Sequence, residues 1–532
     1  MQYPNLWTRG QLMAFSGLDG PTDYAKGLVL RTADDYAVEV KIPGRATLRY
    51  QGPAPSKVEL TGDFAILTAP GKISRLVLAD THNLVIEGDF VVTEHDDNLV
   101  TAVQGARTVL APAGKLDDAL LTAELEPILQ QRARFLNSVT LPDRLPDDLH
   151  AACIKALSQF KTQIYTPEGM IRSTWSTPDR WPHKNMWLWD SVFHAIGIRR
   201  LDIKLARSLV EAVFDAQRED GYIPHMATPT TRSSVTQPPV LGLAIKQLEE
   251  IESDPAWRNR LIPKLGRYLE WVMANRDTDG GGLVEWFISP EKHCRSGESG
   301  MDNSPRFDGA IQLDATDFNA YLAHECEVMA QFQPERRDYW QDHYQRLCRL
   351  INEQLWNEEL GFYVDYDTAG KRQTDIMASA GLLPLLCGAP TPTQARRLRD
   401  HLHNPATFGT PFRVPSIAAE NTAAYSKDMW RGPVWININY MIIHGLKRYG
   451  FLEDAEQLAR DTVAEELKFF RLYGTFFEFY DDRSEDDPPV LLRKPQIALG
   501  DPVFGQPFRD YGWSATLFLE LVLSDRKYAP KA

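Results

Sequence analysis

The sequence predicts a mainly α-helical protein, in which an α/α toroid over residues 148–532 is preceded by a β-sandwich-like domain over residues 1–125. Two patterns support this prediction. Before about residue 125, apolar residues alternate with polar ones or cluster in short β-branched runs, and after residue 148 they recur every three or four positions. The change falls in segment 126–147, which we expect to be a linker. A chain of 532 residues also exceeds the size at which a single core keeps growing, so two domains are expected.

The N-terminal part contains four clear strand signals, each bounded by Gly, Pro, Asp or Asn. Short strands separated by turn residues at this spacing are typical of an antiparallel sandwich. The linker is expected from Leu141–Asp147, where two prolines precede the start of a helix. The four expected strands are Tyr36–Ile42, Ala46–Tyr50, Leu84–Glu87 and Phe90–Thr93.

The C-terminal part has the spacing of amphipathic helices. Long polar loops rich in Gly, Pro, Trp and acidic residues separate these helices. Paired helices joined by such loops indicate a toroid of two rings, with the functional groups on loops at one end. The clearest helices are Leu261–Met273, Phe318–Phe332, Val434–Leu446 and Leu517–Leu523, and the long loops are 165–190, 277–316, 404–433 and 474–512.

The composition excludes several classes of partner. The net charge of −14 argues against a nucleic acid or an anionic membrane, and no apolar run is long enough to span a bilayer. The residues Met1–Asn5 lack the basic and apolar regions of a secretion signal, so we expect a cytoplasmic protein. The cysteines have no zinc or disulfide spacing, so we expect free thiols and neither a metal nor a cofactor. These cysteines are Cys153, Cys294, Cys326, Cys348 and Cys387.

The first candidate site motif is the sequence from Trp187 to Asp190, in which Trp187 and Trp189 flank an acidic residue. Asp190 lies where a loop meets a helix, so it either caps that helix or holds sugar hydroxyls against an indole face. Trp430, Arg431 and Trp435 form a similar group before another helix, where packing between helices is the alternative.

Two acidic residues stand out on irregular segments. Asp302 lies in Glu298–Arg306, among small and turn-forming residues, and is either a turn residue or a catalytic acid. Glu478 lies among aromatic residues in Gly474–Asp481. An apolar setting raises the pKa of a carboxyl, although a neighbouring polar partner would cancel that effect, and a salt-bridged acid is the alternative.

Two carboxylates and an aromatic cleft fit the hydrolysis of a small oligosaccharide or glycoside, in which one carboxylic acid protonates the departing oxygen and one carboxylate acts on the other side of the sugar. No nucleophile elbow, phosphate loop, dinucleotide fingerprint or zinc motif competes. One alternative is a sugar epimerase or isomerase, which would need histidine pairs. Another is a noncatalytic carbohydrate-binding protein. The histidines concerned are His183, His194, His225 and His293, of which His194 is expected to be buried.

These motifs together resemble glycoside hydrolase family 63, which includes processing α-glucosidases and bacterial mannosylglycerate and glucosylglycerate hydrolases. The similarity covers most of residues 150–525. The matching pieces are Trp187–Ser191, Asp220–Pro224, Gln237–Pro239, Glu298–Pro305, Gly361–Tyr363, Trp430–Trp435, the segment around Glu478, and Gly512–Ala515.

The resemblance implies an (α/α)6 barrel, inversion at the anomeric carbon, an α-linked glucoside or small glucose or mannose conjugate as substrate, and catalysis without a metal. It also implies that Asp302 is the general acid and Glu478 the general base. The residues that would line the sugar subsite are Trp189, Asp190, Gln237, Trp430, Arg431, Gly432 and Trp435.

Overall fold

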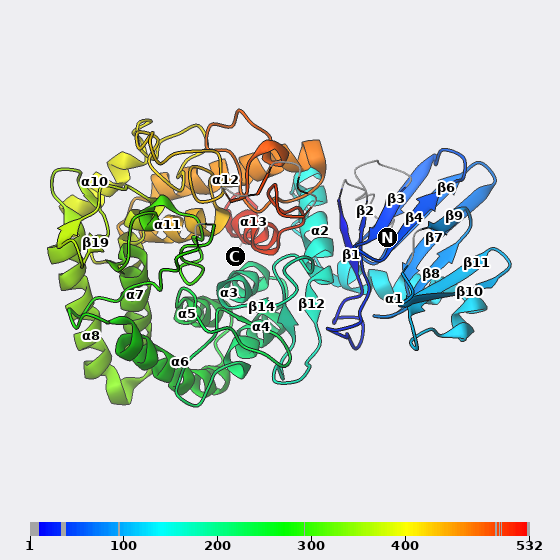
Figure 1. Ribbon diagram of the computed structural model, residues 1–532, viewed down its shortest axis with the longest axis horizontal. Helices are drawn as coiled ribbons and strands as arrows, with labels where there is room; N and C mark the ends of the chain where they lie inside the picture. Colours follow the sequence, from blue (N-terminus) through cyan, green and yellow to red (C-terminus); the bar gives the residue numbers. More distant parts are fainter. Residues whose placement is uncertain are drawn as a thin grey trace. The chain divides into compact units, whose positions relative to one another are not determined.

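A computed structural model describes residues 10–32, 39–93, 96–291, 293–494, 497–498, 501 and 503–528. The chain folds into two compact units (Figure 1). Unit 1 comprises 1–186, 466–476 and 509–532, and unit 2 comprises 187–465 and 477–508. These units differ from the expected division at 125 and 148, because unit 1 also contains the first and last helices of the predicted toroid.

Unit 1 contains two antiparallel sheets, with strand orders β1-β2-β3-β4-β9 and β10-β11-β8-β7-β6-β5. Three of the predicted strands coincide with β4, β8 and β9. The fourth predicted strand is Tyr36–Ile42. Its residues 36–38 lie outside the described residues, and its residues 39–42 form β3. The strands are β1 Leu12–Ala14, β2 Val29–Thr32, β3 Glu39–Ile42, β4 Ala46–Tyr50, β5 Lys57–Leu60, β6 Phe64–Ala69, β7 Lys72–Leu78, β8 Leu84–Glu87, β9 Phe90–Thr93, β10 Leu99–Gln104 and β11 Arg107–Pro112.

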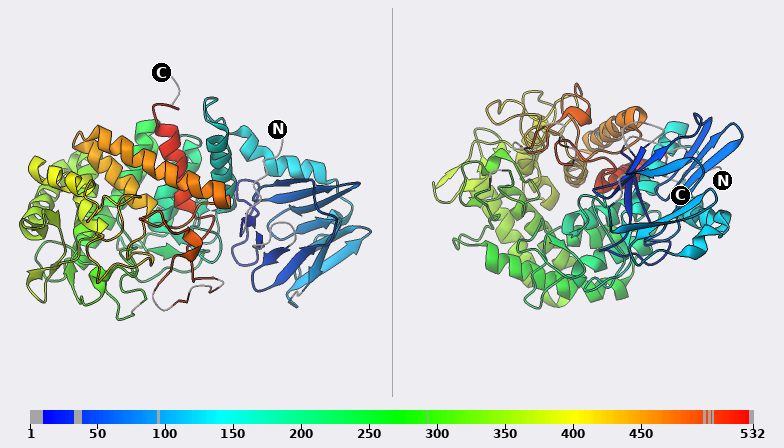
Figure 2. Two further views of the ribbon diagram at one scale, coloured as in Figure 1. Left: turned by 90° about the horizontal axis from the view of Figure 1, so that it is seen from above. Right: turned by 45° about the vertical axis from the view of Figure 1, so that its right-hand side comes forward.

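The two sheets face one another across a shared core, as the blue strands in Figure 2 show. Val40 and Leu48 from the first sheet pack with Leu67, Leu78 and Ile86 from the second, and all five side chains are buried. Side chains along a strand alternate between its two faces, so one sheet face can be entirely apolar. This arrangement is the β-sandwich expected from the sequence.

A helix occupies the segment that was expected to be a linker. Helix α1, Leu125–Ser138, places Leu125, Leu129 and Ala133 on one face, and these residues pack against Phe64 and Val85 on the outer face of the second sheet. The spacing of four residues puts the three side chains on one stripe of the helix. Ile128 and Leu136 extend this stripe, so the sequence did carry a helical pattern that the expectation of a linker overlooked.

The rest of the described chain is mainly helical, and all four predicted helices are present, as α6, α7, α11 and α13. The long helices are α2 Asp147–Thr162, α3 Leu188–Ile198, α4 Ile203–Asp215, α5 Leu241–Ile251, α6 Pro255–Arg276, α7 Thr316–Phe332, α8 Arg337–Leu350, α10 Pro392–His401, α11 Ile436–Arg448, α12 Leu452–Tyr473 and α13 Gly512–Ser524, and α9 Pro384–Cys387 is a single turn. Short strands lie between them: β12 Ile164–Tyr165, β13 Trp175–Ser176, β14 Met186–Trp187, β15 Met226–Ala227, β16 Leu313–Asp314, β17 Trp356–Asn357, β18 Phe362–Tyr363, β19 Tyr366–Asp367 and β20 Arg372–Gln373.

The helices of unit 2 form an inner and an outer series. Helix α3 packs on α5, α5 on α7, α7 on α9 and α9 on α11, while α4, α6 and α8 pack outside them. Every residue of the inner helix α3 is buried, and its sequence is mostly apolar apart from Asp190, Ser191 and His194, whereas α8 keeps an exposed polar face. None of the helices in the described residues is both long enough and apolar enough to cross a membrane. All five cysteines are free, as expected.

Candidate active site

The segment that carries Asp302 lies directly on an indole ring of α3. Gly300 has a φ of +72°, and a Cβ atom added to it would meet Cζ2 of Trp189 at 2.3 Å. Only glycine combines this backbone conformation with so close an approach. The segments around Trp189 and Asp302, which the sequence predicted separately, therefore meet.

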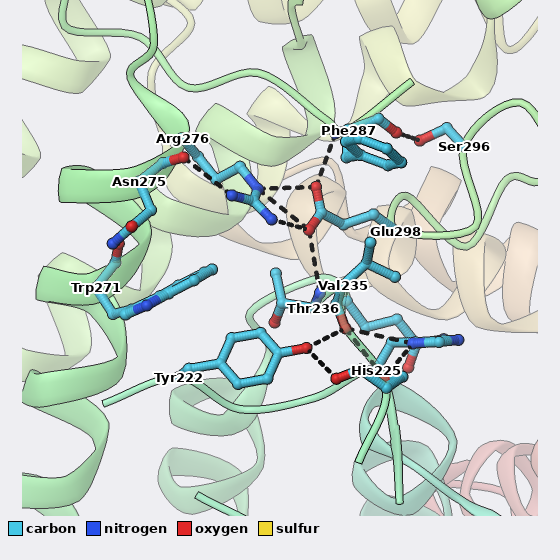
Figure 3. A network of polar contacts seen from close by, with 12 residues as sticks. Tyr222, His225, Val235, Thr236, Trp271, Asn275, Arg276, Phe287, Ser296 and Glu298 are labelled. Carbon is cyan, nitrogen blue, oxygen red and sulfur yellow. Dashed lines mark hydrogen bonds and ion pairs between the residues drawn. The ribbon is translucent and has the colours of Figure 1, made fainter. Parts of the chain in front are cut away.

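The start of the same segment is held by the buried carboxylate of Glu298 (Figure 3). Arg276 at the end of α6 donates to Glu298 Oε1 over 2.7 Å, and the backbone N–H groups of Thr236 and Phe287 donate over 3.0 and 2.7 Å. Hydrogen bonds to a charged group are stronger than neutral ones, so this network fixes the backbone four residues before Asp302.

The end of the segment is held by Arg306, which is buried between two carboxylates. Its guanidinium contacts Asp317 at 2.8 Å and Asp365 at 2.7 Å. Although burial opposes the charge, the two carboxylates outweigh it and raise the pKa of Arg306 above its ordinary value. The planar fork of arginine satisfies both partners at once.

Asn303 joins Asp302 to the second tryptophan group. Its Oδ1 accepts from the N–H of Trp430 over 3.0 Å, and its Nδ2 donates to Asp428 over 3.1 Å. Trp430 stacks on Trp435 with ring centroids 3.9 Å apart, and it lies 6.3 Å from Trp189. The three tryptophans, which the sequence predicted in two separate motifs, therefore form one buried aromatic cluster.

Two further predicted residues adjoin this cluster. The N–H of Trp189 donates to Gln237 Oε1 over 3.1 Å, and both residues are buried. Asp190 is buried in the first turn of α3, whose N-cap residue is Trp187, so Asp190 does not cap the helix. Trp187 is half-buried and meets His225 edge-on, with centroids 5.0 Å apart.

Arg431 and Gly432 have different surroundings from each other. The Arg431 guanidinium pairs with Asp308, on the segment that follows Asp302. Gly432 has a φ of +147° and donates its N–H to Ser416 Oγ over 2.8 Å. Its missing side chain lets the backbone of Ser426 approach closely.

Glu478 is buried in a salt bridge, the alternative that the sequence left open. Arg493 donates from Nε to Oε2 over 2.7 Å and from Nη2 to Oε1 over 3.0 Å. Tyr480, two residues further on, is bridged to Val434 through backbone hydrogen bonds of 2.8 and 3.1 Å, which places Glu478 beside the Trp435 segment. Arg493 is thus the polar partner that the aromatic surroundings alone did not reveal.

The neighbour of Arg493 binds the other candidate carboxylate. Lys494 Nζ lies 2.9 Å from Asp302 Oδ2, and Asp302 keeps 21% of its side chain exposed. Burial raises the pKa of Asp302, but the Lys494 ammonium, with smaller contributions from Arg493 and Cys294, outweighs burial and lowers that pKa. Two consecutive residues therefore bind Asp302 and Glu478.

Two of the histidines that an epimerase would need bind hydroxyl or carboxyl groups. His183 bonds Asp179 over 2.8 Å in unit 1, whereas His225 bonds Ser233 over 2.6 Å in unit 2. Burial lowers the pKa of His194 to about 3 and that of His225 to about 4, so both rings are neutral near pH 7. His293 is exposed beside Glu291.

The chain is similar to known glycoside hydrolases. Residues 183–514 match the family described as mannosylglycerate hydrolase MGH1-like glycoside hydrolase domain. The mannosylglycerate hydrolase of Thermus thermophilus is 27% identical over 57% of this chain and 91% of its own length. The glucosylglycerate hydrolase of Mycolicibacterium hassiacum is 23% identical over 58% of this chain and 88% of its own. A crystal structure of a family 63 mannosylglycerate hydrolase from Thermus thermophilus, in complex with glucose, has a TM-score of 0.57 and 23% identity, and covers 69% of this chain and 99% of its own.

The family match and the relatives named as hydrolases define a glycoside hydrolase of the family 63 type. Since the match extends over most of the chain, this protein belongs to the MGH1-like glycoside hydrolase family. The family excludes the two alternatives of an epimerase and a noncatalytic binding protein.

Proposed function

We propose that this glycosidase hydrolyses an α-linked glucoside or mannoside of a small polar partner, with inversion at the anomeric carbon. Asp302 acts as general acid and Glu478 as general base. The observation that carries the proposal is that Arg493 and Lys494, neighbours in the chain, bind these two carboxylates beside the stacked pair Trp430 and Trp435.

In the proposed reaction, the Asp302 carboxyl donates its proton to the glycosidic oxygen as the bond from that oxygen to the anomeric carbon breaks. Glu478 takes a proton from a water molecule, which attacks the anomeric carbon from the opposite face. Inverting enzymes separate the two carboxyl groups by about 6.5–9.5 Å to hold this water. Arg493 orients the Glu478 carboxylate through two hydrogen bonds.

The proton on Asp302 requires Lys494 to leave the carboxylate. While Lys494 pairs with Asp302, the pKa of the acid is lowered and its charged form is favoured. A substrate whose glycosidic oxygen takes the place of the ammonium removes this attraction and leaves burial, which favours the neutral acid. We infer that substrate binding itself prepares the acid.

The proposed sugar subsite lies between the indoles and the start of α3. Flat apolar faces bordered by hydrogen-bonding groups suit a pyranose ring. The residues proposed to line it are Trp187, Trp189, Asp190, Gln237, Trp430, Arg431, Gly432 and Trp435. We also propose that the helical part of the chain is the (α/α)6 barrel implied by family 63, which the inner and outer helices of unit 2 support.

The relatives named as mannosylglycerate and glucosylglycerate hydrolases make these two compounds the first substrates to test. We expect hydrolysis of at least one of them, or of an α-linked glucose disaccharide, with the inverted anomer as the initial product by NMR. Asp302→Asn and Glu478→Gln should each stay folded by circular dichroism but lose at least about a hundredfold in kcat. Glu478→Gln should also melt below the wild type, because it leaves Arg493 buried without its charged partner. Normal turnover in either variant would disprove the role assigned to that residue.

A further inference from the structure

A second group of acidic side chains lies outside the candidate active site, in the loop after α6 and at the end of β16. One carboxylate oxygen each from Asp279, Glu285 and Asp314 lies within 4.8 Å of the others. Asp277, at the start of the same loop, adds a fourth negative charge that acts on Glu285 and Asp314. No basic side chain of the described residues forms an ion pair with any of the four.

Asp314 is the acidic residue of this group that most needs a cation. It is 2% exposed, and its Oδ1 accepts no hydrogen bond within the described parts of the chain. A buried carboxylate without a donor costs several kcal/mol unless something offsets its charge. Burial first, and then the charges of Asp279, Glu285 and Asp277, raise the pKa of Asp314 to about 7.

We propose that Asp279, Glu285 and Asp314 bind a divalent cation with oxygen ligands, and that this cation is Ca²⁺. Calcium takes carboxylate and carbonyl oxygens at about 2.3–2.6 Å, so two ligand oxygens on opposite sides of it lie nearly 5 Å apart. The 4.8 Å span of these oxygens fits that geometry. Magnesium requires shorter bonds and a more regular octahedron, and softer metals prefer Cys or His.

The loop permits entry of the ion from solvent. Asp279 is exposed, whereas Glu285 and Asp314 form the buried side of the site. Glu285 already accepts from the backbone and the hydroxyl of Thr278 over 2.9 and 3.0 Å at Oε2. These bonds fix its carboxylate but leave its charge uncompensated. The loop turns at Gly280 and Gly282, whose φ values are +78° and +92°.

The proposed ligands flank the segment that carries Asp302. Glu285 directly precedes Trp286 and Phe287, and the N–H of Phe287 donates to Glu298 (Figure 3). Asp314 lies near the other end, and Glu285 and Asp314 already form a backbone bridge. A cation shared by Glu285 and Asp314 would therefore fasten together the two ends of residues 286–313.

The test uses the full-length protein, stripped with EDTA and returned to metal-free buffer at pH 7.5. Calcium chloride should raise the thermal midpoint by several degrees, give a binding isotherm by calorimetry, and slow hydrogen exchange in peptides from 286–313. The same concentration of magnesium chloride should give a smaller shift in midpoint. Because these readouts do not depend on turnover, they remain valid whatever substrate the enzyme hydrolyses.

Asp314→Asn keeps the shape of the side chain and removes one charge. This variant should lose most of the calcium shift, yet in EDTA it should melt at or above the wild-type midpoint, because the repulsion is relieved. Glu285→Gln provides a second test, and Glu335→Gln, an exposed acid elsewhere, should respond like the wild type. The proposal is wrong if millimolar calcium leaves the wild-type midpoint unchanged, or if calcium stabilises Asp314→Asn as much as it stabilises the wild type.

Discussion

Lys494 Nζ lies 2.9 Å from Oδ2 of Asp302. This contact puts a cation on the carboxyl that we propose as general acid, while the preceding residue, Arg493, binds the carboxyl that we propose as general base. The two contacts differ in burial. The Arg493–Glu478 pair is 4% and 2% exposed, whereas the Lys494–Asp302 pair is 15% and 21% exposed. A substrate can therefore displace Lys494 more easily than Arg493.

Replacing Lys494 should change the pH dependence of the reaction. A general acid must be protonated, so the pKa of Asp302 in the free enzyme sets the high-pH limb of kcat/KM. Lys494 lowers that pKa. In Lys494→Met the pKa of Asp302 should rise, and the high-pH limb of kcat/KM should shift to higher pH by about one pH unit or more. The measurement is kcat/KM from about pH 3 to pH 9, because the limb of the wild type lies below 3.8, the ordinary pKa of an aspartic acid.

Lys204→Met is a suitable control, since Lys204 is an exposed lysine of α4. Its pH profile should match that of the wild type. If Lys494→Met lowers activity at every pH without moving the limb, Lys494 does not act through the ionisation of Asp302.

Gly300 offers a test of the contact between Trp189 and the Asp302 segment. In Gly300→Ala, the new methyl group would meet the Trp189 ring at 2.3 Å, with a φ of +72° that alanine tolerates poorly. We expect a loss of about 1–3 kcal/mol in unfolding free energy and a raised KM. Gly309→Ala is the matched control, because a Cβ there meets nothing within 4 Å. Equal behaviour of the two variants in urea unfolding and kinetics would contradict this assignment.

Much of the fold follows from local patterns. The strands Ala46–Tyr50 and Leu84–Glu87 and the helix over Phe318–Phe332 were predictable because each has an apolar periodicity within its own segment. Helix α1 also has an apolar periodicity, at Leu125, Ile128, Leu129, Ala133 and Leu136. It was missed because the prolines at 142 and 146 and the end of the strand-rich part indicated a linker, and that expectation was extended over the helix.

The candidate site was predictable in part. The acids Asp302 and Glu478 could be singled out by their surroundings in sequence, but Arg493 and Lys494 could not, because only tertiary folding brings them to those acids. The acidic cluster escapes prediction for another reason. Closely spaced Cys and His residues mark a metal site in a sequence, whereas Asp279 and Asp314 offer oxygen atoms from the two ends of one predicted loop.

Arg306 should be essential for the stability of the Asp302 segment. Its guanidinium is the shared partner of two buried carboxylates, Asp317 and Asp365. Removing one partner of a buried ion pair leaves an uncompensated charge and costs about 3–5 kcal/mol. Arg306→Met should lose at least that much unfolding free energy at pH 7, and Arg306→Lys should lose less, because lysine keeps the charge but not the planar fork.

The loss of unfolding free energy in Arg306→Met, relative to the wild type, should become smaller as the pH falls. In the wild type, burial raises the pKa of Asp317, but Arg306 outweighs burial and lowers it. This ion pair therefore stabilises the fold at pH values above the pKa of Asp317 in the unfolded chain. The stabilisation is lost as the pH falls through the pKa of Asp317 in the folded protein. In the variant, the Asp317 carboxyl loses the cation that lowers its pKa, and the penalty for its buried charge disappears once it is protonated. Urea unfolding at pH 7 and pH 4.5 would measure the difference. A deficit that is constant between these pH values would mean that Arg306 stabilises the segment by packing rather than by charge.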